Sequence, residues 1–218
     1  MAKSFNYIIS PQISKFRRFS PKLKIGVLAS GKGTNFQELI NLSEKGELDI
    51  EIKVLITSKE DAGCIKRAEN VEIPYKVIRD KDFSQKELFE LEIINTLIHY
   101  DVELVVMAGW MKIVTPFFIN KFKNKIINIH PSLLPAYKGG SAIKDSILNG
   151  AKITGCSVHF VDEEVDSGSL IMQAALSIRD DDDIESLSKR IHMLEHKILP
   201  HSISHAGFLI RSHFMENY

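Results

Sequence analysis

The sequence has no excess of charge of either sign and few cysteines. Lys and Arg together number 28 and balance 28 Asp and Glu among 218 residues, so no net field gathers nucleic acid or an anionic membrane surface. The two cysteines, Cys64 and Cys156, have no C-x-x-C spacing and no clustered partners, which argues against zinc and against a disulfide framework. We therefore expect no bound metal and a reducing, cytoplasmic location.

Long apolar runs are also absent, since none approaches the ~20 residues that a membrane span requires. Hydrophobic residues still make up 44% of the chain, enough for one substantial core but short for two full-sized domains. We expect one domain over residues 23–207, a basic extension over residues 1–22 and a tail over residues 208–218. Pro11 and Pro21 interrupt any long amphipathic helix in the basic segment, which favours a plain cytosolic extension over an organelle transit peptide.

Short β-rich apolar runs alternate with longer helical ones from residue 23 onward. This order predicts a single-domain α/β fold of the doubly wound, Rossmann-like type with a mostly parallel sheet. Helices are expected around Phe36, Ile65, Leu91 and Phe118. The predicted strands are residues 23–29, 50–57, 75–79, 102–107, 125–128, 153–161 and 170–178.

Two further helix signals stand out. Ser84 and Glu87 have the spacing of a capping box, which predicts a helix from there to about His99. Near the end of the chain, apolar residues at spacings of three and four predict one helix stripe: Ile184, Leu187, Ile191, Leu194 and Ile198. The acidic run 180–183 lies where a helix dipole favours negative charge.

Small residues follow the first predicted strand in the string SGKGTN, residues 30–35. Small side chains let backbone approach a ligand closely, and free N–H groups at a helix start bind phosphate. A tight strand-to-helix turn without a ligand is the alternative. Because the chain lacks both G-x-x-x-x-G-K-[ST] and, here, G-x-G-x-x-G, a small phosphorylated metabolite fits better than a nucleotide.

A polar cluster follows the fifth predicted strand in the string NIHPSLLP, residues 128–135. Strand alternation puts Asn128 and His130 on the same side, where both could meet one small group. An amide donor beside an imidazole suits acyl transfer, in which a carbonyl oxygen gains negative charge and needs preorganised donors. The alternative is a pair of capping residues at a strand end.

Four strings in one order, SGKGTN, AGWMKIVTP, NIHPSLLP and GCSVHFVDEEVDSG, resemble those of the phosphoribosylglycinamide formyltransferases, over roughly residues 23–207. Methionyl-tRNA formyltransferases and formyltetrahydrofolate deformylases are similar around Asn128 and His130. These two families carry an additional C-terminal or N-terminal domain, for which we expect no room in 218 residues. The resemblance implies transfer of a formyl group from 10-formyltetrahydrofolate to the amine of glycinamide ribonucleotide, in purine synthesis.

The resemblance also implies roles for particular residues on the substrate side. It assigns the substrate phosphate to the backbone of Gly33, Thr34 and Asn35, and the glycinamide and ribose side to Glu195. The alternative for Glu195 is a solvated helix residue. His192 and His196, spaced i, i+4, lack the further ligands of a metal site, and we interpret them as surface or packing residues.

The catalytic residues that the resemblance implies are Asn128, His130 and Asp166. A carboxylate near an imidazole favours the charged ring, which then serves as a proton donor. Without the resemblance, Asp166 in Val165-Asp166-Ser167-Gly168 reads as a turn between two strands. Direct attack of the amine on the formyl carbon needs no covalent enzyme intermediate, and the chain offers no activated nucleophile motif.

On the side of the formyl donor, the resemblance implies the following set: Lys86, Met111, Lys112, Ile113, Val114, Asn128 and Val161. An apolar wall with backbone donors suits a flat pteridine ring. Relatives often have an arginine at Lys86 and a histidine near Ser141. Ser141 cannot replace the charge of that histidine, and this departure concerns the positioning of the substrate. A point charge replaces a planar bidentate group at Lys86, which weakens that contact.

Two other functions are compatible with parts of this sequence pattern. A formyltetrahydrofolate hydrolase would use water in place of the amine, and it would need neither the phosphate loop nor Glu195. A non-catalytic folate- or nucleotide-binding protein would not need all three polar residues. We expect small-molecule substrates, no nucleic acid, no membrane, and a monomer or homodimer.

Overall fold

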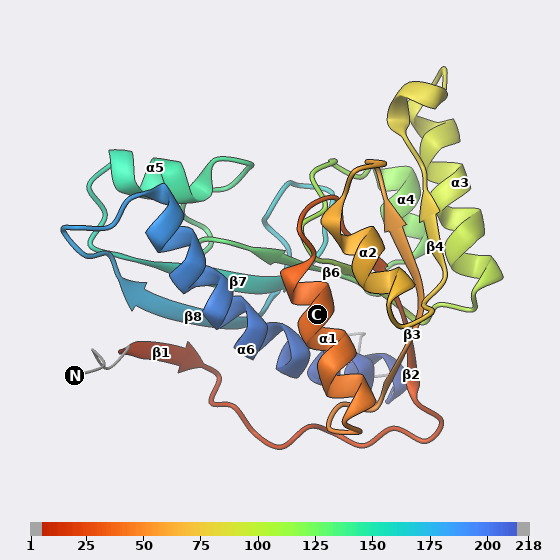
Figure 1. Ribbon diagram of the computed structural model, residues 1–218, viewed down its shortest axis with the longest axis horizontal. Helices are drawn as coiled ribbons and strands as arrows, with labels where there is room; N and C mark the ends of the chain where they lie inside the picture. The colour runs from red at the N-terminus through yellow and green to blue at the C-terminus, as the bar shows by residue number, and fades with distance from the viewer. Residues whose placement is uncertain (1–5, 213–218) are drawn as a thin grey trace.

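One eight-stranded sheet forms the centre of the molecule (Figure 1). The structure is a computed structural model, and it describes residues 6–212. The strands are β1 (Tyr7–Ser10), β2 (Leu23–Leu28), β3 (Ile50–Thr57), β4 (Tyr75–Val77), β5 (Leu104–Met107), β6 (Ile126–His130), β7 (Ile153–Phe160) and β8 (Leu170–Ser177). The helices are α1 (Thr34–Glu44), α2 (Gly63–Glu69), α3 (Lys86–His99), α4 (Pro116–Lys121), α5 (Ala142–Leu148) and α6 (Ile184–Arg211), with a short 3₁₀ helix η1 (Asp80–Asp82).

The strand order is β1-β8-β7-β6-β5-β2-β3-β4. Strands β4, β3, β2, β5 and β6 run parallel, whereas β7, β8 and β1 join antiparallel on the β6 side. The chain order moves outward from β2 in one direction through β3 and β4, and then in the other through β5 and β6. This reversal creates a switch point between β2 and β5, where ligands bind in open α/β sheets. The predicted single-domain, mostly parallel α/β fold is confirmed.

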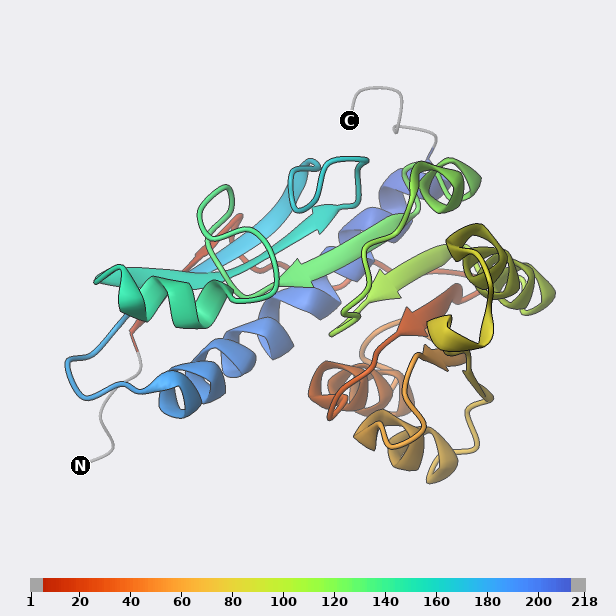
Figure 2. The same cartoon turned by 90° about the horizontal axis from the view of Figure 1, so that it is seen from above.

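Helices cover both faces of the sheet (Figure 2). Helices α1, α2 and α6 pack on one face in a buried cluster, and α3 and α4 pack on the other face in a second cluster. Strand alternation sorts the side chains: Leu55 of β3 belongs to the first cluster, and its neighbours Val54 and Ile56 belong to the second. Both faces of the central strands β2 and β5 are therefore buried, which explains their nearly continuous apolar runs.

The helix signals are partly correct. Helix α3 spans Lys86–His99 as expected, but its N-cap is Gln85 and no side chain caps it, so the predicted Ser84–Glu87 capping box is wrong. Leu187 and Leu194 of the α6 stripe are fully buried, but Ile184 is 50% exposed because it is the first residue of the helix. A capping box instead joins Asp183 and Ser186, where each side chain accepts from the backbone N–H of the other residue.

The segment before β2 packs along the domain. Strand β1 pairs with β8 at the edge of the sheet. The backbone N–H of Arg17 donates to Ser204 Oγ of α6 at 2.8 Å, and the Arg18 side chain pairs with Asp49 at 2.8 Å. At the other end of the domain, α6 continues to Arg211, past the expected boundary at residue 207. Within residues 6–212, no helix is long and apolar enough to cross a membrane.

Candidate active site

The loop after β2 begins the site. Gly33 takes the left-handed conformation with φ of 69°, and a Cβ there would lie 2.6 Å from Cβ of Cys64. Glycine is required at this position because both the conformation and the contact exclude a side chain. The N–H of Gln37 donates to Gly33 O at 2.9 Å and begins α1. The N–H groups of Thr34 and Asn35 precede this bond, so they have no acceptor inside the helix.

Asn35 and Glu195 meet although they lie 160 residues apart. Asn35 Nδ2 donates to Glu195 Oε2 at 2.8 Å, and the two residues are 8% and 5% exposed. Burial raises the pKa of Glu195, while the charge of His192 and the Asn35 hydrogen bond oppose it. Oδ1 of Asn35 is buried without a partner among the described residues, which leaves an acceptor for a ligand hydroxyl or amine.

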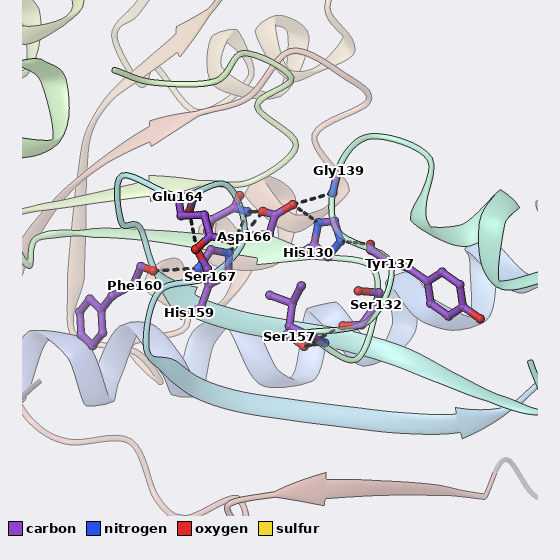
Figure 3. Close-up of polar contacts among 12 residues, drawn as sticks. His130, Ser132, Tyr137, Gly139, Ser157, His159, Phe160, Glu164, Asp166 and Ser167 are labelled. Carbon is purple, nitrogen blue, oxygen red and sulfur yellow. Dashed lines mark hydrogen bonds and ion pairs between the residues drawn. The ribbon is translucent and has the colours of Figure 1, made fainter. Parts of the chain in front are cut away.

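His130 and Asp166 face each other at the end of β6 (Figure 3), and Asn128 of the same strand joins them. Asn128 and His130 lie on the same side of the strand, as alternation predicts. Asp166, from the loop between β7 and β8, reaches both: Oδ2 lies 3.4 Å from His130 Nδ1, and Oδ1 lies 3.5 Å from Asn128 Nδ2. The structure therefore brings the three predicted catalytic side chains into one cluster.

The carboxylate of Asp166 is held ionised. Burial raises its pKa, but the His159 contact, the Gly139 N–H at 2.8 Å and the charge of His130 together lower the pKa to about 2. Asp166 itself has a left-handed backbone with φ of 51°, a conformation that Asp tolerates better than most residues. This carboxylate therefore keeps its negative charge throughout the pH range in which proteins work.

Both ring nitrogens of His130 face acceptors. Nε2 lies 2.8 Å from the carbonyl oxygen of Tyr137, and Nδ1 faces Asp166. A carbonyl only accepts, so Nε2 carries a proton in this contact, and an imidazolium satisfies both neighbours. The loop after β6 is anchored below the ring by Ser157, whose Oγ donates to Ser132 O at 2.7 Å and accepts from Leu134 N at 3.0 Å.

His159 is a further member of the cluster, which the sequence reasoning missed. It lies opposite Asn128 in the β6–β7 pairing and is 2% exposed. Its Nδ1 donates to the Phe160 carbonyl at 2.8 Å, and its Nε2 lies 3.2 Å from Asn128 Nδ2 and 3.6 Å from Asp166 Oδ1. When the ring is neutral, Nε2 accepts from the Asn128 amide, and when it is charged, Nε2 donates to the Asp166 carboxylate. His159 therefore links these two side chains.

The predicted wall for the formyl donor follows β5. Met111 and Ile113 are 64% and 62% exposed, whereas Val114 is partly buried. Lys112 pairs with Asp80 of η1 at 2.5 Å. Strand β5 pairs with β6 so that Met107 lies opposite Asn128, which puts this loop beside the cluster.

The remaining predicted residues lie around these loops. The N–H of Val161 donates to Ile126 O at 2.9 Å, at the start of the loop that carries Asp166. Lys86 is the first residue of α3 and is exposed. Ser141 is the exposed N-cap of α5, and its side chain forms no cap hydrogen bond. His192 is exposed, and His196 is partly buried. Within residues 6–212, no group of three or more His, Cys, Asp or Glu could hold a metal ion.

The α/β fold and the polar cluster are those of an enzyme. The chain belongs to the formyl transferase family, whose sequence model matches residues 23–203. Among solved structures, phosphoribosylglycinamide formyltransferase from Bacillus Halodurans is 37% identical with a TM-score of 0.81, covering 83% of this chain and 93% of that one. Glycinamide ribonucleotide transformylase 1 from Geobacillus kaustophilus is 36% identical with a TM-score of 0.81, covering 84% and 97%.

Curated relatives are longer proteins. The trifunctional purine biosynthetic protein adenosine-3 of Chironomus tentans is 43% identical over 185 residues, which are 84% of this chain and 14% of the relative. The protein of the same name from Gallus gallus is 40% identical over 179 residues, 82% and 18% of the two chains. The chain thus spans less than a fifth of these relatives.

Proposed function

We propose that this chain transfers the formyl group of 10-formyltetrahydrofolate to the amine of glycinamide ribonucleotide, in purine synthesis. The observation that carries the proposal is the contact of Asp166 with both His130 and Asn128, beside the loops that follow β2 and β5. Membership of the formyl transferase family and the names of the similar solved structures support the same reaction.

The ribonucleotide lies against the start of α1 and Glu195 of α6. Its phosphate accepts from the N–H groups of Gly33, Thr34 and Asn35, since free donors at a helix start favour an anion. Glu195 and the unpartnered Oδ1 of Asn35 accept from the hydroxyl or amine groups of the substrate. Burial of Glu195 strengthens such a hydrogen bond because water competes less.

The formyl donor, a co-substrate, lies on the other side of the cluster. Met111 and Ile113 expose apolar surface that a flat ring covers, and Lys112 and Val114 continue this wall together with Val161. Lys86, at the start of α3, attracts the carboxylates of the donor's glutamate end. The formyl carbon is then close to Asn128.

The reaction forms one C–N bond and breaks another. The glycinamide amine attacks the formyl carbon, and the formyl oxygen gains negative charge. This oxygen accepts from Asn128 and from His130 Nε2, where it takes the place of the Tyr137 carbonyl oxygen. Cleavage of the bond to the folate nitrogen follows as that nitrogen takes a proton and the attacking nitrogen loses one. Asp166 stabilises the charge on His130 throughout.

One assay tests the proposal directly. The protein is incubated with 10-formyltetrahydrofolate, with and without glycinamide ribonucleotide, and both folate product and formylated ribonucleotide are measured. We expect equal amounts of the two products and only when the ribonucleotide is present. Release of formate at the same rate without ribonucleotide would instead identify a hydrolase, and no turnover in either arm would overturn the proposal.

Replacing Lys86 by Ala is expected to raise the KM for the formyl donor roughly 2- to 5-fold, the size of an exposed charge contact worth at most about 1 kcal/mol. The KM for the ribonucleotide should change little because the two substrates lie on opposite sides of the cluster. Steady-state kinetics with each substrate varied in turn measure both values. Lys121→Ala, at the exposed end of α4, is the control. A larger effect on the ribonucleotide would mean that the two sites are exchanged.

A further inference from the structure

Arg67 of α2 lies against the loop that precedes α1. Its Nε donates to the carbonyl oxygen of Lys32 at 2.8 Å, and its Nη1 donates to Gln37 Oε1 at 2.9 Å. Gln37 in turn donates to Asn41 Oδ1 at 3.0 Å. A planar guanidinium has several donors in a fixed arrangement, so it can hold the loop and the first turn of the helix at once.

This contact sets the direction of a neighbouring donor. In a trans peptide the C=O and the N–H point to opposite sides. Because the carbonyl of Lys32 points to Arg67, the N–H of Gly33 in the same peptide points away from Arg67, to the other side of the loop. The left-handed Gly33 then leads into α1. Arg67 therefore fixes the orientation of one donor that the proposed phosphate site uses.

The charge of Arg67 is also available to an anion. Within the described residues its guanidinium forms no ion pair with a carboxylate. The titratable groups near it include Cys64 of α2, Glu38 of α1, and His192 and His196 of α6. Burial lowers the pKa of His196, Glu38 raises it, and His192 and Arg67 lower it further. A phosphate dianion at the loop would thus add negative charge where Arg67 has no carboxylate partner.

We propose that Arg67 is a positioning residue for substrate phosphate: it holds the Lys32 carbonyl so that the Gly33 N–H faces the phosphate, and its charge favours the dianion. The proposal rests on the proposed function of the α1 loop. It concerns the phosphate alone, and Arg67 has no part in the chemistry at Asn128 and His130.

The test compares two amine substrates, glycinamide ribonucleotide and its dephosphorylated ribonucleoside. In Arg67→Met the KM for the ribonucleotide is expected to rise about 10- to 100-fold, the range for losing hydrogen bonds and charge at an ionised group, with kcat changed less than about threefold. The kcat/KM for the ribonucleoside should be the same in both proteins. Arg67→Lys keeps the positive charge but loses the planar arrangement of several donors, so its effect on the KM for the ribonucleotide should be intermediate. Lys66→Met, on the same helix, is the control.

A merely structural role predicts a different pattern. Loss of fold would lower kcat/KM for both amine substrates by the same factor and lower the melting temperature, and this result would overturn the proposal. If Arg67→Met does not fold, the same comparison is made with Arg67→Lys. If the wild type does not use the ribonucleotide, the proposed function fails, but the role of Arg67 can still be tested. Wild type and variant are then titrated with inorganic phosphate while the amide NMR signals of Gly33 and Asn35 are followed. Equal phosphate affinity in wild type and variant would reject the role of Arg67.

Discussion

Asp166→Asn is expected to lower kcat at neutral pH by about 10²–10⁴-fold, the range typical of losing general acid–base help. The amide has the shape of the carboxylate and can still accept from the Gly139 N–H, which lies 2.8 Å from Oδ2. It lacks the negative charge that faces His130 Nδ1 at 3.4 Å. Because the loss is in charge rather than in contacts with substrate, the KM values of both substrates should change far less.

The pH dependence sharpens this test. The pKa of Asp166 is about 2, so the carboxylate is ionised from about pH 4 upward and does not titrate in the working range. The loss of kcat in Asp166→Asn should therefore be present at every pH from 6 to 9, because the charge that the variant lacks is present in the wild type across that whole range. Near-normal kcat across pH 6 to 9 would show that Asp166 is only part of the loop.

Local patterns were enough to predict the inner part of the fold. Residues 50–57 form β3 as predicted, and both faces of the strand are buried from Val54 to Thr57. Strand β1 was missed because Tyr7–Ser10 is largely exposed and becomes a strand only by pairing with β8, about 160 residues later in the chain. Helix α5 was not predicted, because its seven residues are too few to show a clear apolar period.

In the candidate site, too, local features could be predicted and contacts between distant segments could not. Asn128 and His130 could be predicted to share a side because alternation along one strand is a local property. The contact of Asn35 with Glu195 and that of Arg67 with Lys32 depend on how α1, α2 and α6 pack, which no spacing in the sequence reveals. Part of the position of His159 could be predicted, because alternation along the predicted strand 153–161 puts it on the same face as Ser157. Its register against Asn128 could be read only from the structure.

Replacing Asn128 by Ala is expected to lower kcat about 10²–10³-fold, the cost of removing one donor to an oxyanion. The donor is needed only when the formyl oxygen gains charge, so the KM of either substrate should change little. Steady-state kinetics with each substrate varied in turn measure kcat and both KM values.

His159 supplies the control that decides whether Asn128 acts as a positioned donor. Nε2 of His159 lies 3.2 Å from the amide nitrogen, and its ring is fixed by the Phe160 carbonyl at 2.8 Å. His159→Ala should lower kcat less than Asn128→Ala, since the imidazole orients the amide without contacting the formyl group. If His159 acts through Asn128, the double variant should be no slower than Asn128→Ala alone, because coupled residues give non-additive effects. Multiplied losses would show that His159 works through Asp166 instead.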